Sequence, residues 1–200
     1  MAAPLDFYFD LSSPYGYIAA HKIDDLAATH GRTVNWRPLL LGVAFKQTGG
    51  APLTELPLKG DYAKRDIPRS ARFHGVPFRM PAVFPIPTHV PARIVLWARD
   101  QEPAAPARAA KAFYQAYFRD GLDISKPEIA AEIAGKAGFD AVQARAAIDD
   151  PAIKEALKRE VDMAIAAGVF GSPFVIVGDE PFWGLDRFDQ LDRWLTTGGF

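Results

Sequence analysis

The chain has 200 residues, of which 49% are hydrophobic and 24% charged, as expected of one globular domain, alone or with a large insertion. Its formal net charge of −1 gives no support to nucleic-acid binding, which favours a basic excess, and no apolar run is long enough to span a membrane. The absence of cysteine excludes disulfides, thiolate metal sites and a catalytic protein thiol, and a cytoplasmic location is the default expectation.

The first predicted element is a half-buried strand that begins at Leu5, where apolar and polar residues alternate. A helix start follows abruptly, because Pro14 suits the first helical position and Ser13 then falls at the N-cap. This places a serine hydroxyl at the positive end of a helix, just past the carboxyl end of a strand. α/β proteins tend to hold anionic or nucleophilic ligands there. The alternative interpretation is that Ser13 only caps the helix.

The same helix is expected to continue to about His30, since apolar residues recur along one face and Gly31 is a natural stop. A second strand follows over residues 33–37. A strand, a helix and a strand form a βαβ unit, so the two strands should be parallel with a right-handed crossover. From about Leu41, glycines and prolines predict a long loop.

Helical segments are predicted after this loop. They are expected over residues 59–74, 91–100, 107–119 and 127–137, and from Asp150-Pro151 to Gly168. The first two are separated by a passage over 77–87 that holds too many prolines for any regular element.

The end of the chain returns to a strand pattern. Residues 174–177 form a short apolar run typical of a buried strand, residues 178–180 predict a hairpin turn, and residues 181–183 a short partner strand. Asp186 is then expected to cap a last helix, whose inward-facing residues are Phe188, Leu191 and Leu195.

Three motifs in this order along the chain resemble one family. Residues 7–14 read Phe-Tyr-Phe-Asp-Leu-Ser-Ser-Pro, residues 168–173 read Gly-Val-Phe-Gly-Ser-Pro, and residues 183–187 read Trp-Gly-Leu-Asp-Arg. The first resembles the start of the kappa-class glutathione transferases and of the bacterial 2-hydroxychromene-2-carboxylate isomerases, which are related to the DsbA-type oxidoreductases. The second is similar to the family's loop before a cis-proline, and the third to its Trp-Gly-x-Asp-Arg motif.

The resemblance implies an α/β fold, in which a thioredoxin-like domain carries an inserted all-helical domain. The order of the predicted elements agrees with it, because β-α-β is followed by a helical interruption and then by β-β-α. We therefore assign residues 1–40 and 169–200 to the thioredoxin-like, glutathione-binding domain and residues 41–168 to the inserted helical domain. The resemblance also implies a homodimer.

Glutathione is the cofactor that the resemblance implies. In the oxidoreductase relatives the helix start carries two cysteines three positions apart, where this chain has Ser13 and Gly16, so thiol–disulfide exchange is excluded. The Ser13 hydroxyl is instead expected to be catalytic, because it would donate a hydrogen bond to the thiolate of bound glutathione with help from the helix dipole. A lowered thiol pKa makes the sulfur nucleophilic near neutral pH.

The two later motifs imply further glutathione-binding residues. Ser172 would pair through its backbone with the peptide part of glutathione, next to a cis peptide bond at Pro173. The γ-glutamyl end carries an ammonium group, which needs a carboxylate such as Asp186. The segment expected to lie against that end comprises Trp183, Gly184, Leu185 and Asp186.

Two residues are candidates for contact with the substrate, which is expected to lie between the domains. Lys46 stands in the place of a family lysine that meets the substrate carboxylate, the alternative being an ordinary solvated lysine. Phe84 stands where some isomerases of the family have tyrosine. No metal site is expected, because no metal-ligand spacing is shared by the four histidines, His21, His30, His74 and His89.

The resemblance predicts a glutathione-dependent isomerase of aromatic catabolism, acting on a small aromatic molecule. It would interconvert 2-hydroxychromene-2-carboxylate and trans-o-hydroxybenzylidenepyruvate, or a close analogue, by addition of the glutathione sulfur to a conjugated enone, bond rotation and elimination. One alternative is a kappa-type glutathione transferase that conjugates or reduces electrophiles. Another is a non-catalytic glutathione- or peptide-binding module.

Overall fold

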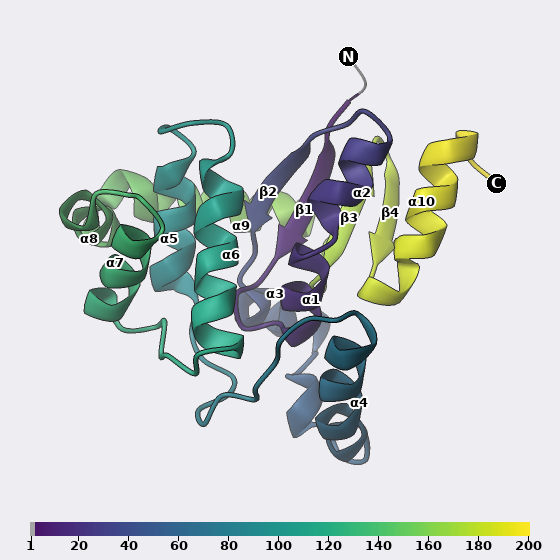
Figure 1. Cartoon of the computed structure of the whole chain (residues 1–200), viewed down its shortest axis with the longest axis horizontal. Helices are drawn as coiled ribbons and strands as arrows, with labels where there is room; N and C mark the ends of the chain where they lie inside the picture. Colours follow the sequence, from purple (N-terminus) through teal and green to yellow (C-terminus); the bar gives the residue numbers. More distant parts are fainter. Residues whose placement is uncertain (1–2) are drawn as a thin grey trace.

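Four short strands form one mixed sheet in the computed structural model, which describes residues 3–200. The strands are β1 (Leu5–Phe9), β2 (Val34–Pro38), β3 (Phe174–Val177) and β4 (Glu180–Trp183). Their spatial order is β2-β1-β3-β4, with β1 parallel to β2 and antiparallel to β3, and β3 antiparallel to β4 (Figure 1). Segments from the two ends of the chain therefore pair in the middle of the sheet.

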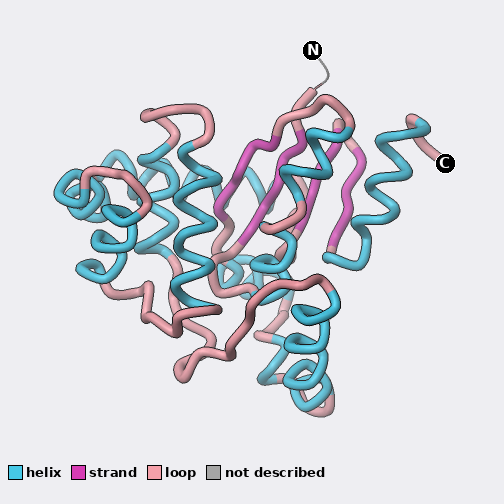
Figure 2. Tube along the Cα trace, viewed as in Figure 1, coloured by secondary structure: helices cyan, strands magenta, loops and turns pink. Residues whose placement is uncertain are grey.

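Helices cover both faces of this sheet and extend to one side of it (Figures 1 and 2). The α-helices are α1 (Pro14–Ala20), α2 (Ile23–Thr29), α3 (Leu41–Thr48), α4 (Lys59–Phe73), α5 (His89–Ala98), α6 (Ala105–Phe118), α7 (Pro127–Lys136), α8 (Ala141–Asp149), α9 (Pro151–Ala166) and α10 (Phe188–Thr197). Two short 3-10 turns are η1 (Leu53–Glu55) and η2 (Leu185–Arg187). Along residues 3–200, none of the helices has both the length and the apolar character that crossing a membrane requires.

Most predicted elements are present. The first two strands are parallel, the proline-rich passage between α4 and α5 has no regular structure (Figure 2), and the predicted β3 matches in full. Asp150 caps α9 by accepting a hydrogen bond from the amide of Ala152 at 2.7 Å. Gly168 follows the end of this helix with φ of +81°, a conformation that favours glycine.

The single helix predicted from Pro14 to His30 is wrong, because this segment forms the two helices α1 and α2. The amides of His21 and Lys22 each bond a carbonyl three residues back, at 3.2 and 2.9 Å. These tighter bonds turn the chain between the two helices.

The predicted loop from Leu41 is wrong at its start, where α3 forms instead. The Leu41 amide donates to the Asp10 carboxylate at 2.7 Å, which anchors the first turn, and Gly49 ends the helix with φ of +70°. α8 is a further helix absent from the prediction, and the carboxylate of Asp140 caps it. Neither helix carries a long apolar stripe that would mark it in the sequence.

Asp186 does not cap the last helix, contrary to the prediction. The turn η2 lies between β4 and α10, so Arg187 takes the N-cap position and Asp186 falls inside the turn. The inward-facing residues are as predicted, since Phe188 and Leu191 are buried and Leu195 packs against the core.

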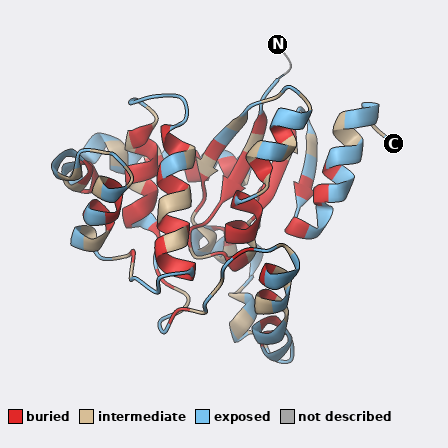
Figure 3. Ribbon diagram, in the orientation of Figure 1, coloured by how far each residue is buried: buried red, intermediate tan, exposed pale blue. Residues whose placement is uncertain are grey.

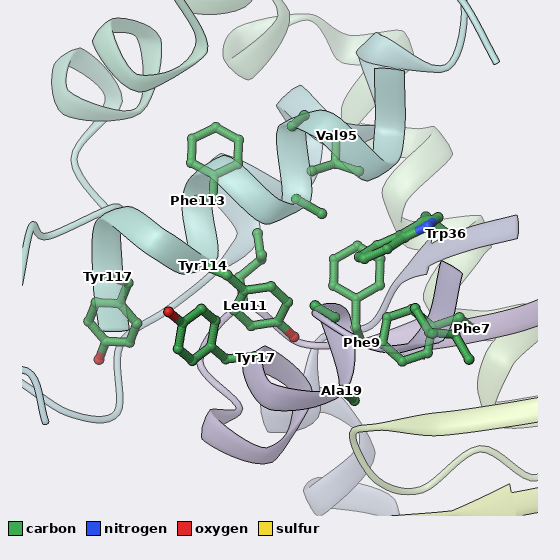
Figure 4. Close-up of a cluster of buried hydrophobic side chains, with 14 of the residues drawn as sticks. Phe7, Phe9, Leu11, Tyr17, Ala19, Trp36, Val95, Phe113, Tyr114 and Tyr117 are labelled. Atoms are coloured by element: carbon green, nitrogen blue, oxygen red, sulfur yellow. The ribbon is translucent and has the colours of Figure 1, made fainter. Parts of the chain in front are cut away.

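The main hydrophobic core lies between the sheet and the helices α1, α5 and α6 (Figure 3). Figure 4 shows Tyr114 of α6 close to Phe9 and Tyr17, with ring centroids 6.0 and 5.8 Å away. Aromatic pairs at such separations stabilise the fold by more than their buried area alone accounts for. Helix α6 therefore packs directly on β1 and α1. The domain division at residues 40 and 168 stays a prediction, and residues 1–2 of its first segment lie outside the described residues.

A charged cluster fastens α9 to α5 and β2. Glu160 of α9 is buried and accepts hydrogen bonds from Arg37 at 2.9 Å and from Arg99 at 2.8 and 3.0 Å. Arg37 also donates to Asp6 of β1 at 2.8 Å. Burial alone would raise the pKa of Glu160, but the hydrogen bonds and charges of the two arginines hold that pKa below its ordinary value.

Replacing Glu160 by Gln should lower the free energy of unfolding by about 2 to 3 kcal/mol at neutral pH, because two arginines lose their shared carboxylate. The folded pKa of Glu160 lies below its unfolded value. Its contribution is therefore present above that unfolded value, about 4.5, and is lost as the pH falls through the folded one. The difference in stability between wild type and variant should narrow in acid.

Denaturant unfolding at neutral and acid pH checks this expectation. Glu155→Gln is the matched control, because Glu155 is exposed on the same helix and its nearest cation, Arg159, is 4.0 Å away. That change should cost well under 1 kcal/mol. A Glu160→Gln loss of equal size at both pH values would contradict the role given to the ion pairs.

Candidate functional site

Ser13 lies at the N-cap of α1, as predicted from the serine–proline pair. Its hydroxyl oxygen accepts a hydrogen bond from the Gly16 amide at 3.0 Å, and its own amide donates to the Asp10 carbonyl at 2.8 Å. Pro14 carries no amide hydrogen and the Ser13 cap satisfies the Gly16 amide, so two of the first helical positions need no further acceptor. The residue is 4% exposed, so the loop around it holds the hydroxyl in one place.

The Ser13 hydroxyl also contacts the loop before β3. It donates to the backbone carbonyl of Ser172 at 2.8 Å, and the Ser172–Pro173 peptide bond is cis, as predicted. A hydroxyl has one proton. Ser13 can therefore donate either to the Ser172 carbonyl or to an approaching anion, and a ligand that uses this donor must draw the hydroxyl away from the carbonyl.

The carboxylate of Asp10 connects the segments around Ser13. It accepts hydrogen bonds from the Ser12 amide at 2.8 Å, from the Leu41 amide at 2.7 Å and from the Thr88 hydroxyl at 3.0 Å. Burial raises the pKa of Asp10, and these three uncharged donors oppose the shift. The loop before α1, the start of α3 and the start of α5 thus meet at one side chain.

The segment after β4 lies beside the cis-proline. The Gly184 amide donates to the Pro173 carbonyl at 3.0 Å, and Gly184 has φ of +103°, which favours glycine. The Asp186 carboxylate folds back against Gly184, is exposed, and pairs with Arg187 at 3.0 Å. The structure therefore brings Asp186 to the same end of the sheet as Ser172 and Pro173.

Trp183 and Leu185 differ in what they offer a ligand. Trp183 is 56% exposed, and its indole covers Gly171 and meets the ring of Phe170 edge-on at 4.9 Å. Leu185 is 8% exposed and belongs to the main core, so only its backbone can contact a ligand.

Lys46 and Phe84 lie on segments that reach the same end of the sheet. Lys46 is exposed in the last turn of α3, the helix whose first amide binds Asp10. Phe84 is half-buried against Phe118 with ring centroids 6.3 Å apart. Two residues further on, the Ile86 amide donates to the Ser12 hydroxyl at 3.2 Å.

Two surface hollows lie beside β4 and beside α3. One, of about 310 Å³, lies between β4 and α10 and is lined in part by Trp183, Arg187 and Trp194. The other, of about 270 Å³, lies between α3 and the loop after α9 and is lined in part by Gln47, Thr48 and Phe170. Within residues 3–200, no three histidine, aspartate or glutamate side chains come together in a way that could hold a metal ion.

Sequence reasoning missed the roles of Asp10 and Thr88 and the position of Tyr114. Asp10 lies inside the first motif, between the strand and Ser13, and this position in the sequence could have indicated its role. Thr88 and Tyr114 are more than 70 residues from Asp10, at separations of 78 and 104. Nothing local in the sequence marks such partners.

The amino-acid sequence matches a known family and several known proteins over nearly its whole length. The model of the DSBA-like thioredoxin domain matches residues 4–196. The 2-hydroxychromene-2-carboxylate isomerase of Sphingobium xenophagum is 32% identical over 197 residues, which cover 98% of this chain and 99% of that protein. The glutathione S-transferase kappa 2 of Caenorhabditis elegans is 25% identical over 204 residues, covering 95% and 90%.

A solved structure of a 2-hydroxychromene-2-carboxylate isomerase superposes with a TM-score of 0.86, at 27% identity. The superposition covers 96% of this chain and 94% of that one, so the resemblance includes both the sheet and the helices around it. The chain therefore belongs to the DSBA-like thioredoxin family, in the group of the 2-hydroxychromene-2-carboxylate isomerases and the kappa-class glutathione transferases.

Proposed function

We propose that the chain is a glutathione-dependent isomerase that interconverts 2-hydroxychromene-2-carboxylate and trans-o-hydroxybenzylidenepyruvate, or a close analogue. The observation that carries the proposal is the hydroxyl of Ser13, held at the start of α1 beside the Ser172 carbonyl and the cis-proline. The relatives named as isomerases, one of them 32% identical over nearly the whole chain, support an enzyme of this kind. A cytoplasmic location and a homodimer remain predictions.

Ser13, Ser172 and Asp186, at one end of the sheet, fit glutathione. The tripeptide carries a thiol, amide groups and an ammonium group. Ser13 offers a hydroxyl donor for a thiolate, the half-buried Ser172 offers backbone groups at a strand start, and the exposed Asp186 offers a carboxylate for the ammonium. In such a complex the Asp186 carboxylate would leave its ion pair with Arg187 and pair with the ammonium group of the ligand. Loss of the Arg187 pair costs little free energy, because both side chains are exposed.

Bound glutathione would supply a thiolate that adds to a conjugated double bond and later departs. Ser13 would turn its proton from the Ser172 carbonyl to the sulfur, which favours the charged form and lowers the thiol pKa. Lys46 would hold the substrate carboxylate at the mouth of the site, and the aromatic ring of Phe84 would line it. The protein's own side chains thus orient both molecules and stabilise charge.

A kappa-type glutathione transferase is the second candidate. It is favoured by the kappa transferase of Caenorhabditis elegans, which is 25% identical over 95% of this chain. The two activities need the same Ser13 and differ in whether the sulfur leaves the product. The substrate contacts therefore distinguish them better than the thiol site does.

Glutathione should stabilise the fold if the cofactor assignment is correct. At about a hundred times its dissociation constant a ligand adds roughly 2.7 kcal/mol, so the midpoint of thermal unfolding should rise. Thermal unfolding without ligand, with glutathione and with S-methylglutathione measures this. No shift with either compound would remove glutathione from the proposal.

Ser13→Ala should keep the fold and lose most of the activity, whereas Ser12→Ala should lose little activity. Ser13→Ala removes the thiolate donor and leaves the Gly16 amide without its cap, which costs about 1 kcal/mol of stability. The Ser12 hydroxyl instead accepts from the Ile86 amide. Unfolding midpoints and kcat/KM separate the two effects, and equal activity losses would show that Ser13 is not the donor.

Lys46→Met should raise KM strongly for 2-hydroxychromene-2-carboxylate and leave the conjugation of neutral chlorodinitrobenzene nearly unchanged. The substitution keeps the length of the side chain and removes the charge that would meet a carboxylate. Lys136→Met is the matched control, since Lys136 is exposed on α7 and pairs with Glu132. Wild-type protein that conjugates the neutral electrophile and never isomerises the chromene would favour the transferase.

A further inference from the structure

Gly16, three residues after Ser13, packs against two hydroxyl groups. A Cβ atom at this position would lie 2.5 Å from the Tyr114 hydroxyl oxygen and 2.8 Å from the Ser172 hydroxyl oxygen. Both distances are shorter than a carbon–oxygen contact allows. Glycine is therefore required here by space, and two polar groups fill the volume beside the helix start.

The Tyr114 hydroxyl helps to fix the backbone that holds Ser13. It donates to the Asp10 carbonyl at 2.8 Å, and the same carbonyl accepts the Ser13 amide at 2.8 Å. Tyr114 is fully buried, and burial raises its pKa well above the ordinary value, so it remains a donor at neutral pH. Loss of this hydroxyl would free the carbonyl that orients the Ser13 amide.

The Ser172 hydroxyl holds the amide of the same residue, Asp10. It accepts the Asp10 amide at 2.9 Å, while the Ser172 carbonyl accepts the Ser13 hydroxyl at 2.8 Å. The side chain of Ser172 thus ties its own backbone to Asp10, and through Asp10 to Tyr114. The two hydroxyls thus hold both backbone groups of Asp10, the residue whose carbonyl accepts the Ser13 amide.

We propose that Tyr114 and Ser172 are positioning residues, whose hydroxyls hold the carbonyl and the amide of Asp10. They thereby fix the turn that places Ser13, and so set how strongly Ser13 stabilises the thiolate of bound glutathione. The inference rests on the proposed function, since it assigns the thiolate to glutathione. Neither hydroxyl touches the sulfur, and both act through the place and orientation of Ser13.

The test measures the ionisation of bound glutathione in three variants. Thiolate ultraviolet absorbance is followed against pH, with the S-methylglutathione complex as the blank. Tyr114→Phe and Ser172→Ala should each raise the pKa of the bound thiol and leave a roughly tenfold smaller thiolate fraction at neutral pH. If Tyr114→Phe does not fold, the thiol pKa in Ser172→Ala alone tests the inference.

Tyr17→Phe is the matched control. Tyr17 is buried in α1, and its hydroxyl donates to the Pro77 carbonyl at 2.7 Å, outside the bonds that hold Ser13. Removing that hydroxyl should lower stability and leave the ionisation of the bound thiol as in wild type. An unchanged thiol pKa in Tyr114→Phe and Ser172→Ala, or an equal rise in Tyr17→Phe, would overturn the inference.

A second measurement tests the packing without any ligand. Gly16→Ala and Tyr114→Phe should each lower the midpoint of thermal unfolding. The loss in the double variant should be smaller than the sum of the two single losses, because Tyr114→Phe removes the oxygen that a Cβ at position 16 would meet. If the losses in the unfolding midpoint are strictly additive, Gly16 and the Tyr114 hydroxyl do not pack against each other as inferred. If the wild-type protein binds no glutathione, both the proposed function and this inference are wrong. If the wild type binds glutathione and the variants leave the pKa of the bound thiol unchanged, only this inference is wrong.

Discussion

The buried carboxylate of Asp10 is the constraint on which this site depends. It lies at the end of β1 and accepts hydrogen bonds from the loop before α1, from the start of α3 and from Thr88 before α5. A carboxylate is costly to bury unless donors satisfy it, so all three segments must be in place together. The same contacts bring Ser13 and the helix that carries Lys46 to one end of the sheet. Folding and site assembly are therefore coupled.

In the proposed function, the chemistry at this end of the sheet depends on one hydroxyl proton. Ser13 has one hydroxyl hydrogen, which it donates in a hydrogen bond to the Ser172 carbonyl in this structure. An anion at the start of α1 competes for it and gains from the partial positive charge of the helix end. Because the chain has no cysteine, a nucleophilic sulfur here has to come from a ligand. The protein's part is to present a donor at the right place and to hold it there.

Local patterns predicted much of the fold, because β1, β3, α9 and the Ser13 cap are each set by alternation, apolar runs or capping residues close in sequence. The misses have a common cause. The break at His21 and Lys22, the start of α3 and the place of Asp186 depend on tertiary contacts or on a turn of three residues. The site followed the same rule. Its motifs could be read from the sequence, but Thr88 and Tyr114, which support the site, come from distant segments that no local signal marks.

A crystal structure of the protein with glutathione bound tests the central claim most directly. We predict that the glutathione sulfur lies within hydrogen-bond distance of the Ser13 hydroxyl, that the Ser172 backbone pairs with the peptide, and that the Asp186 carboxylate binds the ammonium group. The Asp10 carboxylate should keep its three donors. A sulfur bound away from Ser13, with the Ser13 hydroxyl still donating to the Ser172 carbonyl, would contradict the account.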